Sequence, residues 1–403
     1  MNTLTNFQRL CVIALCSTSL GVGVFRFSYT ALMPLTIDQH WWDLHFATSL
    51  ASSNLIGYLI GAIIAIFAIK EHMIRPVLIL SALFGSISLI ACGMIALPEF
   101  WYLSWRIISG LVGGLLMVLG PSFALKQVLP EQKNLLGLIA FSGIGFGVLL
   151  TTTLLPQVGH FSVAVAWYAL GGLSLVLTLI LAYMLKTLPQ THASDHPNLQ
   201  VNPAALTDQQ RLLALLVIAA YFMSAIAYIP HSLYWVDFLV HRLELPQSFA
   251  NLQWMVYGSG SLIGALTAFF SVKRWGGMGA LWRLYLIYSL AIFIPAYFSN
   301  PYLLTLSSFF SGVMNPATVS LSSILLADIV TAQRHRQAWG AAVMAFAIAQ
   351  LIGGLGMGYL LVHHVEYQQL FAMGGSAMAI GVGLSLWMVY AKKQPQKASS
   401  MAL

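Results

Sequence analysis

The sequence predicts an all-α polytopic membrane protein that crosses a lipid bilayer twelve times. Hydrophobic residues make up 59% of the 403-residue chain, charged residues make up only 7%, and the mean hydropathy is +0.82. A soluble domain carries roughly 25% charged residues, so this chain could not cover a water-exposed surface. Apolar runs of about 18 residues or more recur along the chain, and each can cross the hydrocarbon core as a helix. The runs lack the two-residue alternation of barrel strands, which leaves helices as the spanning elements.

The expected spans alternate with short polar segments. In order, they are 8–36, 47–69, 76–97, 100–127, 134–156, 162–187, 210–238, 249–272, 278–299, 301–327, 338–362 and 366–391. Fourteen of the 18 Lys and Arg residues fall in segments on one side of the bilayer, and only Arg242 falls on the other. Because basic residues collect on the cytoplasmic side, we expect both termini in the cytoplasm and a multi-pass location in the cytoplasmic (inner) membrane. The net charge of +7 then indicates contact with anionic inner-leaflet lipid and no nucleic-acid partner.

The two halves of the chain resemble each other at an offset of 202 or 203 residues. Gly57 and Gly61 in the second span match Gly260 and Gly264 in the eighth. Further matches at this offset are Lys70 with Lys273, Ser109-Gly110 with Ser311-Gly312, and Gly137 with Gly340. Matches that recur in the same order indicate the duplication of a six-helix unit.

A polar segment at 188–209 separates the two halves. It is rich in proline, histidine and aspartate, a composition typical of a linker. We therefore expect an N-terminal six-helix bundle at 1–187, a cytoplasmic linker at 188–209, a C-terminal six-helix bundle at 210–391 and a cytoplasmic tail at 392–403.

The fourth span carries the stretch Arg106-Ile-Ile-Ser-Gly110-Leu-Val-Gly113-Gly114. This stretch resembles the Arg-x-x-x-Gly-x-x-x-Gly signature of the major facilitator superfamily, and residues 21–29 and 54–62 are similar to its poorly characterised YbfB-like branch. The resemblance implies two parallel six-helix bundles joined by a central cytoplasmic linker. The loop at 70–76 departs from the superfamily's pattern, because it keeps basic residues but lacks the Asp and the second Gly. The resemblance therefore does not carry the superfamily's usual gating over to this loop.

Two arginines inside predicted spans, Arg26 and Arg106, are the main functional candidates. At a rise of about 1.5 Å per residue, the distance of Arg26 from Arg9 and that of Arg106 from Trp101 place both arginines at a similar depth in the outer half of the bilayer. A guanidinium is costly there and indicates function by default. Two of them could clamp a carboxylate or a similar anion, because the planar group pairs bidentately. Two other interpretations stay open: Arg26 reaches the outer interface while Arg106 bonds backbone carbonyls, or the arginines pair with Asp38 or Asp237.

Further polar and aromatic residues complete the expected substrate site. They are Tyr29, Asn54, Tyr58, His231, Trp254, Tyr257, Asn315 and Gln350. Pro230 is expected to break its helix and free backbone carbonyls. His231, next to this break, aligns in the repeat with Ser28, which is close to Arg26 in the sequence, and so comes to a similar depth. A histidine there could carry a coupling proton, bind substrate, or act as a neutral donor in helix packing.

Carboxylates are absent from the middle of every predicted span. The candidates for carrying a coupling proton are therefore His231, Asp237 and Asp38. The sequence has no Walker loop for ATP and no Cys/His spacing typical of a metal site. We expect no catalytic residue, no metal and no cofactor.

These observations favour a secondary active transporter that moves a small organic solute, with an organic anion preferred, by alternating access and with proton coupling. The alternative is a multidrug transporter that exports lipophilic compounds, which the aromatic residues and the scarcity of charge favour. A membrane-embedded enzyme would need clustered carboxylates or His ligands, which the sequence lacks. The expected partners are a small-molecule substrate, the lipid bilayer and, as the candidate coupling ion, protons; we expect a monomer.

Overall fold

The computed structural model describes residues 4–189, 206–330 and 332–393, and within them all regular structure is helical. The elements are α1 (Asn6–Thr18), η1 (Ser19–Val24), α2 (Ser28–Asp38), α3 (Leu44–Phe67), η2 (Glu71–Met73), α4 (Ile74–Cys92), α5 (Glu99–Leu125), α6 (Pro130–Val158), α7 (Val163–Thr187), α8 (Asp208–Ala227), α9 (Ile229–Asp237), η3 (Phe238–Arg242), α10 (Gln247–Tyr297), α11 (Pro301–Ile329), α12 (Ala332–Val362) and α13 (Tyr367–Lys393). The predicted all-α class is confirmed. The predicted linker and tail lie largely outside the described residues.

The number of crossings depends on one long helix, α10. Eleven helical segments of the described residues are long and apolar enough to cross a membrane, and α10, with 51 residues, is one of them. Gly276 inside α10 has a non-helical backbone, with φ at 68° and ψ at 163°. At 1.5 Å per residue α10 is about 76 Å long, which is enough for two crossings of a core about 30 Å thick. The structure therefore agrees with twelve crossings, of which the eighth and ninth meet at Gly276 without a separate loop.

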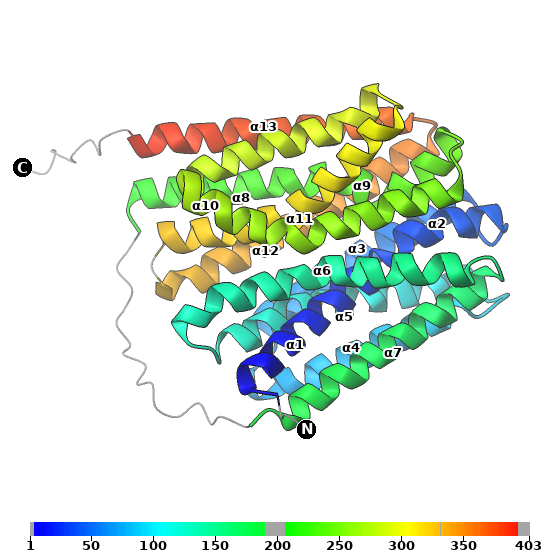
Figure 1. Cartoon of the computed structure of the whole chain (residues 1–403), viewed down its shortest axis with the longest axis horizontal. Helices are drawn as coiled ribbons and strands as arrows, with labels where there is room; N and C mark the ends of the chain where they lie inside the picture. The colour runs from blue at the N-terminus through cyan, green and yellow to red at the C-terminus, as the bar shows by residue number, and fades with distance from the viewer. Residues whose placement is uncertain (1–3, 190–205, 331, 394–403) are drawn as a thin grey trace, which may run out of the picture.

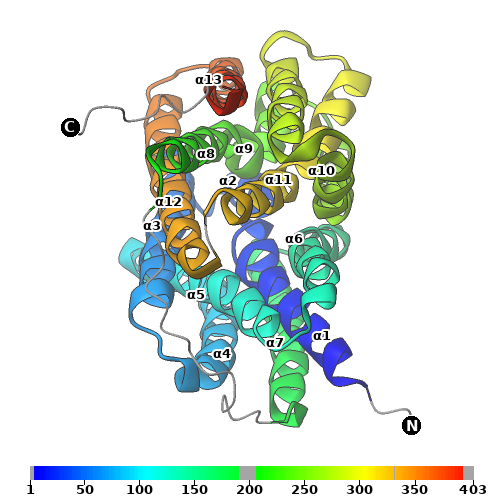
Figure 2. The same cartoon turned by 90° about the vertical axis from the view of Figure 1, so that its left-hand side faces the viewer.

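The helices form two bundles that lie side by side (Figures 1 and 2). The N-terminal bundle consists of α1 to α7, and the C-terminal bundle consists of α8 to α13. Within the N-terminal bundle α3 packs along α5, and within the C-terminal bundle the first part of α10 packs along α11.

Glycines set the close approach of these helix pairs. A Cβ atom built on Gly57 of α3 would lie 1.9 Å from the carbonyl oxygen of Ile107, and one built on Gly110 of α5 would lie 1.9 Å from that of Asn54. The repeat-related Gly312 shows the same crowding, at 2.1 Å from the carbonyl oxygen of Tyr257. Small residues allow backbones to touch in lipid, where no hydrophobic effect drives helices together.

The first and seventh crossings are both broken at repeat-related positions. The first consists of α1, the π-helix η1 and α2, with a turn at 25–27 between η1 and α2. The seventh breaks at Tyr228 between α8 and α9, and it ends in the π-helix η3. The predicted break next to Pro230 is confirmed. Such breaks leave backbone carbonyls without their usual helical donors, and irregular backbone at this depth needs partners from neighbouring helices.

The two bundles contact each other along three seams, in which α6 packs on α10, α3 on α12 and α2 on α9. Ser142 of α6 donates a hydrogen bond to the Leu262 carbonyl of α10 over 2.9 Å. Between α2 and α9, Thr30 donates to the Ser232 carbonyl. These seams bring the broken parts of the first and seventh crossings together at the boundary between the bundles.

Candidate functional site

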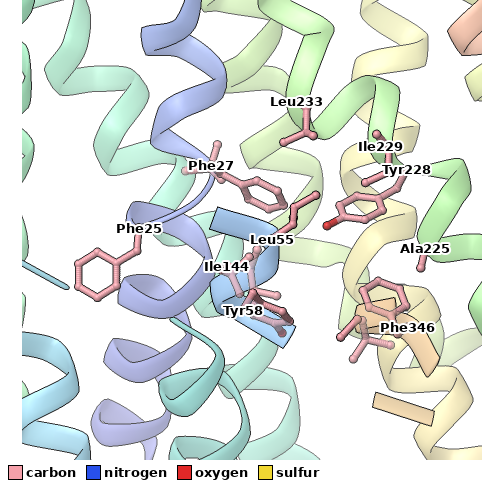
Figure 3. Packing of buried hydrophobic residues seen from close by; sticks show 14 of the residues in the cluster. Phe25, Phe27, Leu55, Tyr58, Ile144, Ala225, Tyr228, Ile229, Leu233 and Phe346 are labelled. Atoms are coloured by element: carbon pink, nitrogen blue, oxygen red, sulfur yellow. The ribbon is translucent and has the colours of Figure 1, made fainter. Parts of the chain in front are cut away.

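Arg26 reaches across the boundary between the bundles. It lies in the turn between η1 and α2, is only 4% exposed, and donates from Nη1 to Oε1 of Gln350 in α12 over 2.8 Å. Its guanidinium carbon lies 5.7 Å from the ring centroid of Tyr58 and 5.3 Å from that of Tyr228. Tyr58 and Tyr228 come from different bundles and face the same region (Figure 3). Arg26 therefore joins both halves of the molecule at the level of the helix breaks.

An aromatic group lies beside Arg26 on the C-terminal bundle. Trp254 and Tyr257 of α10 stack with their centroids 4.6 Å apart, and both are fully buried. Phe27 of the N-terminal bundle meets these rings edge-on, at 5.8 Å from Trp254 and 6.1 Å from Tyr257. Asn315 of α11 donates to the Tyr257 hydroxyl over 3.0 Å. Apolar rings with a few polar groups are typical of small-molecule sites.

Several buried donors in this group lack a hydrogen-bond partner. Within the described residues, Nε and Nη2 of Arg26 and Nε1 of Trp254 bond to nothing, and no acidic side chain lies within ion-pair distance of Arg26. An unpaired buried guanidinium is unfavourable. An arriving acceptor with negative charge would satisfy these donors, so the arrangement suits a small anion that also carries an apolar part.

Arg106 lies in a different environment, inside the N-terminal bundle. It is 1% exposed and donates from Nη1 to the Phe25 carbonyl over 3.2 Å. Ser109 and Asn54 donate to the same oxygen, over 3.1 Å and 3.4 Å. The next helical donor, the amide of Tyr29, bonds instead to the Arg26 carbonyl. Arg106 therefore helps to satisfy a carbonyl that the helix break sets free.

The structure does not bring Arg26 and Arg106 onto a common partner. The guanidinium carbon of Arg106 lies 4.6 Å from the ring centroid of Tyr29 and 6.0 Å from that of Trp167, whereas Arg26 faces Gln350. The two arginines therefore do not form the predicted clamp in this structure, and only Arg26 faces the boundary between the bundles. The open interpretation in which Arg106 bonds backbone carbonyls describes its contacts.

The other predicted site residues also fall into two groups, one at the boundary between the bundles and one inside a single bundle. The boundary group consists of Tyr58, Trp254, Tyr257, Asn315 and Gln350, together with Arg26. Tyr29 lies inside the N-terminal bundle, where its hydroxyl donates to the Ala47 carbonyl over 2.9 Å. Asn54 lies there too, between the Phe25 and Arg106 carbonyls. His231 lies inside the C-terminal bundle, 2.9 Å from the Ser307 hydroxyl and stacked on Trp235 at 4.7 Å.

Replacing Arg106 with Met should destabilise the protein by about 2–4 kcal/mol, because it removes a charge-assisted hydrogen bond and a buried cation–π contact. Thermal unfolding of the detergent-purified protein measures this. Arg26→Met is the matched comparison, because each arginine donates one side-chain hydrogen bond and lies against aromatic rings. It should cost less, since Arg26 leaves two buried nitrogens without a partner and Arg106 leaves only Nε. An equal loss in both variants would contradict the structural role of Arg106.

The predicted coupling candidates Asp38 and Asp237 come together through a residue that the sequence prediction missed. His241 of η3 contacts Asp237 from Nδ1 at 2.7 Å and Asp38 from Nε2 at 2.8 Å. Asp38 belongs to the N-terminal bundle, whereas Asp237 and His241 belong to the C-terminal bundle. The spacing of four residues between Asp237 and His241 was the available signal, because such residues share a helix face.

Phe27 and Tyr228 are the other site residues that the prediction missed. Both flank the helix breaks, and both rings point into the boundary between the bundles, whereas Phe25 points away from it (Figure 3). The ring of Phe25 lies against Gly85 of α4. The periodicity of an unbroken helix could not assign these directions, since the breaks at 25–27 and 228 reset the helical phase.

A family model described as "Uncharacterised MFS-type transporter YbfB" matches residues 18–386. Among solved structures, a D-xylose–proton symporter matches with a TM-score of 0.72 and 16% identity, over 95% of this chain and 96% of that chain. The xylose transporter XylE from E. coli, in a partially occluded inward-open conformation, matches with a TM-score of 0.72 and 16% identity, over 96% and 98%. The nucleoside transporter NupG matches with a TM-score of 0.69 and 14% identity, over 95% and 100%. At these identities the likeness shows the fold alone. The comparison with curated proteins gives no match.

Proposed function

Since this chain belongs to the YbfB-type family of the major facilitator superfamily, whose members are transporters and not enzymes, we propose that it moves a small organic anion across the cytoplasmic membrane by alternating access. The observation that carries the proposal is Arg26, a buried guanidinium at the boundary between the bundles with two unpartnered nitrogens. In an alternating-access fold, the boundary between the halves is the region that opens to either side in turn. A group there meets solute from both compartments.

The chemistry around Arg26 favours a carboxylate attached to an apolar body. The planar guanidinium can donate two parallel hydrogen bonds to a carboxylate. Gln350 holds one of its nitrogens and so fixes its orientation, and Tyr58, Tyr228 and Phe27 supply apolar surface around it. The neighbouring Trp254 and Tyr257 extend that surface.

Proton coupling, the membrane location and the orientation are parts of the same proposal. The network of Asp38, His241 and Asp237 offers protonatable groups at the outer junction of the bundles. The basic residues of the predicted inner segments support cytoplasmic termini in the cytoplasmic membrane. The solved D-xylose–proton symporter shows that this fold accommodates proton-driven transport.

Purified protein in liposomes should accumulate a radiolabelled small carboxylate when the inside is made alkaline. A panel of monocarboxylates, dicarboxylates, sugars and nucleosides identifies the class, because only an anion gains charge–charge attraction to Arg26 in addition to hydrogen bonds. Collapse of the pH gradient with a protonophore should abolish accumulation, and protein-free liposomes are the control. Uptake of neutral solutes with no uptake of any carboxylate would reject the anion preference.

Export of lipophilic compounds is the second candidate, and the buried rings of Phe27, Trp254 and Tyr257 favour it. An unpaired arginine at the same place repels lipophilic cations. Cells that express the protein should therefore show no added resistance to cationic dyes. Robust, energy-dependent export of such dyes would favour the second candidate over the first.

A further inference from the structure

The outer ends of the two bundles are joined by a network of four side chains. His241 contacts Asp38 of α2 and Asp237 of α9, at 2.8 Å and 2.7 Å. The hydroxyl of Tyr367, the first residue of α13, donates to the second oxygen of Asp237. The Asp237 side chain is fully buried, whereas those of His241 and Asp38 are 30% and 47% exposed. The network therefore has one end anchored in the C-terminal bundle and the other in contact with outer water.

The hydrogen-bond pattern requires an added proton. A carboxylate oxygen only accepts, and a neutral imidazole donates from one nitrogen and accepts at the other. Both ring nitrogens of His241 face carboxylate oxygens. With both carboxylates ionised and the imidazole neutral, only one of the two contacts can be a hydrogen bond. Both contacts become hydrogen bonds when the three residues together hold one additional proton. An imidazolium between Asp38 and Asp237 meets this condition and leaves the trio with a net charge of −1.

Loss of that proton would break the link between the bundles. A lone pair of the imidazole would then face one of the carboxylates, and the trio would carry a net charge of −2. Because Tyr367 holds Asp237 in place and Asp38 is half exposed, the Asp38 contact is the one that can open. Opening it separates α2 from η3, which belong to different bundles.

The other charged groups at this end are Asp43 and Glu99 of the N-terminal bundle and Arg242, Glu244 and Glu366 of the C-terminal bundle. Asp43 caps its own helix α3 by accepting from the Phe46 amide over 2.7 Å. Arg242 pairs with Glu366 over 2.7 Å, and both side chains are about half exposed. This pair does not cross to the N-terminal bundle, so its titration leaves the junction intact. Deeper in the membrane, Thr30 and Ser232 join α2 to α9 through groups that do not titrate.

We propose that His241, Asp38 and Asp237 form a proton-binding latch that closes the outer side of the transporter. A proton taken from outer water onto His241 joins the bundles, and its return to outer water releases them. External acidity then favours the outward-closed state. The proposal rests on the alternating access proposed above and adds a protonation site that controls which side is open.

The test measures the separation of the outer ends directly. Spin labels at Phe161→Cys and Tyr302→Cys report the distance between the bundles, since these outer side chains are 70% and 86% exposed. The native Cys11, Cys16 and Cys92 are buried and compete poorly for label. Double electron–electron resonance on full-length protein in nanodiscs, without substrate, is recorded from about pH 5 to about pH 10, on both sides of ordinary histidine titration.

As the pH rises, the wild-type protein should gain a population with a longer distance between the two labels. The ratio of closed to open molecules should change by at most about tenfold per pH unit, which is the limit when one proton is released. His241→Gln and Asp38→Asn should both lose this pH dependence. Asp38→Asn changes a half-exposed residue and so keeps the test available if the His241 variant does not fold. His45→Gln, which alters another exposed outer histidine, should keep the wild-type response.

Two results would overturn the latch: a wild-type distance distribution that does not change with pH, or a wild-type response that persists in either network variant. The distances need no substrate, so they separate the latch from the proposed cargo. Constant distances with intact proton-driven carboxylate uptake reject the latch alone. A pH-dependent distance without carboxylate uptake rejects the cargo and leaves the latch standing.

Discussion

Arg26→Ala is expected to weaken binding of the transported anion by about 10- to 100-fold. The variant removes the only cationic side chain that the described structure places at the boundary between the bundles near Gln350. A hydrogen bond to a charged group contributes about 1.5–3 kcal/mol, and each 1.4 kcal/mol corresponds to a factor of about ten in affinity. The weaker binding should raise the apparent KM for uptake. It should also reduce the increase in unfolding temperature that the bound anion gives.

Two further arginine variants sharpen this experiment. Arg26→Lys keeps the positive charge but loses the bidentate fork, so its affinity should fall between those of wild type and Arg26→Ala. Arg283→Ala is the matched control, because Arg283 also lies in a predicted span but contacts Trp282 at 4.3 Å and the Gly279 carbonyl at 2.8 Å, both on its own helix α10. Wild-type KM in Arg26→Ala, or an equal loss in Arg283→Ala, would remove Arg26 from the substrate site.

Gly57→Ala is expected to destabilise the fold by about 3 kcal/mol, the upper end of the range for overpacking. The added Cβ would lie 1.9 Å from the Ile107 carbonyl oxygen. This neighbour is backbone and cannot move to another rotamer, so α3 and α5 must separate along their length. Monodisperse yield and the unfolding temperature in detergent measure the effect.

Gly172→Ala is the control for this substitution. Gly172 lies within α7, and a Cβ built there meets no atom within 4 Å. Alanine should be neutral there or should stabilise the helix by up to about 1 kcal/mol through its higher helix propensity. If both variants unfold at the same temperature as wild type, the close approach of α3 and α5 does not limit stability.

The class of the fold could be predicted because hydropathy and charge are local properties of the chain. Each span needs only about 20 apolar residues, and the excess of Lys and Arg on one side follows from the order of the segments alone. The repeat was visible for a related reason, since glycines such as Gly57 and Gly260 are required wherever the same backbone contact recurs. The eighth and ninth crossings were predicted as separate spans, and the structure joins them at Gly276 because a residue with φ at 68° turns the backbone without a loop.

The candidate site could be predicted only as a list of unusual residues in spans. Gln350, Tyr58 and Asn315 were singled out because polar groups are rare in lipid, and the structure places them around Arg26 and Tyr257. Tyr29 and Asn54 were singled out for the same reason, but they satisfy groups inside the N-terminal bundle. A sequence shows that a buried polar group needs a partner but does not show which partner it has.

The sequence by itself determined that this chain spans a membrane in two related halves and that Arg26 and Arg106 lie buried at similar depth. Only the tertiary structure decided which of the two arginines faces the other bundle and which bonds a backbone carbonyl. The break at 25–27 turns Arg26 towards Gln350 of the other bundle, while the carbonyl that it frees at Phe25 engages Arg106. The junction of Asp38 with His241 was equally hidden, since its residues are 203 positions apart. Depth follows from position along one helix, whereas direction and partnership depend on how separate helices are rotated and packed.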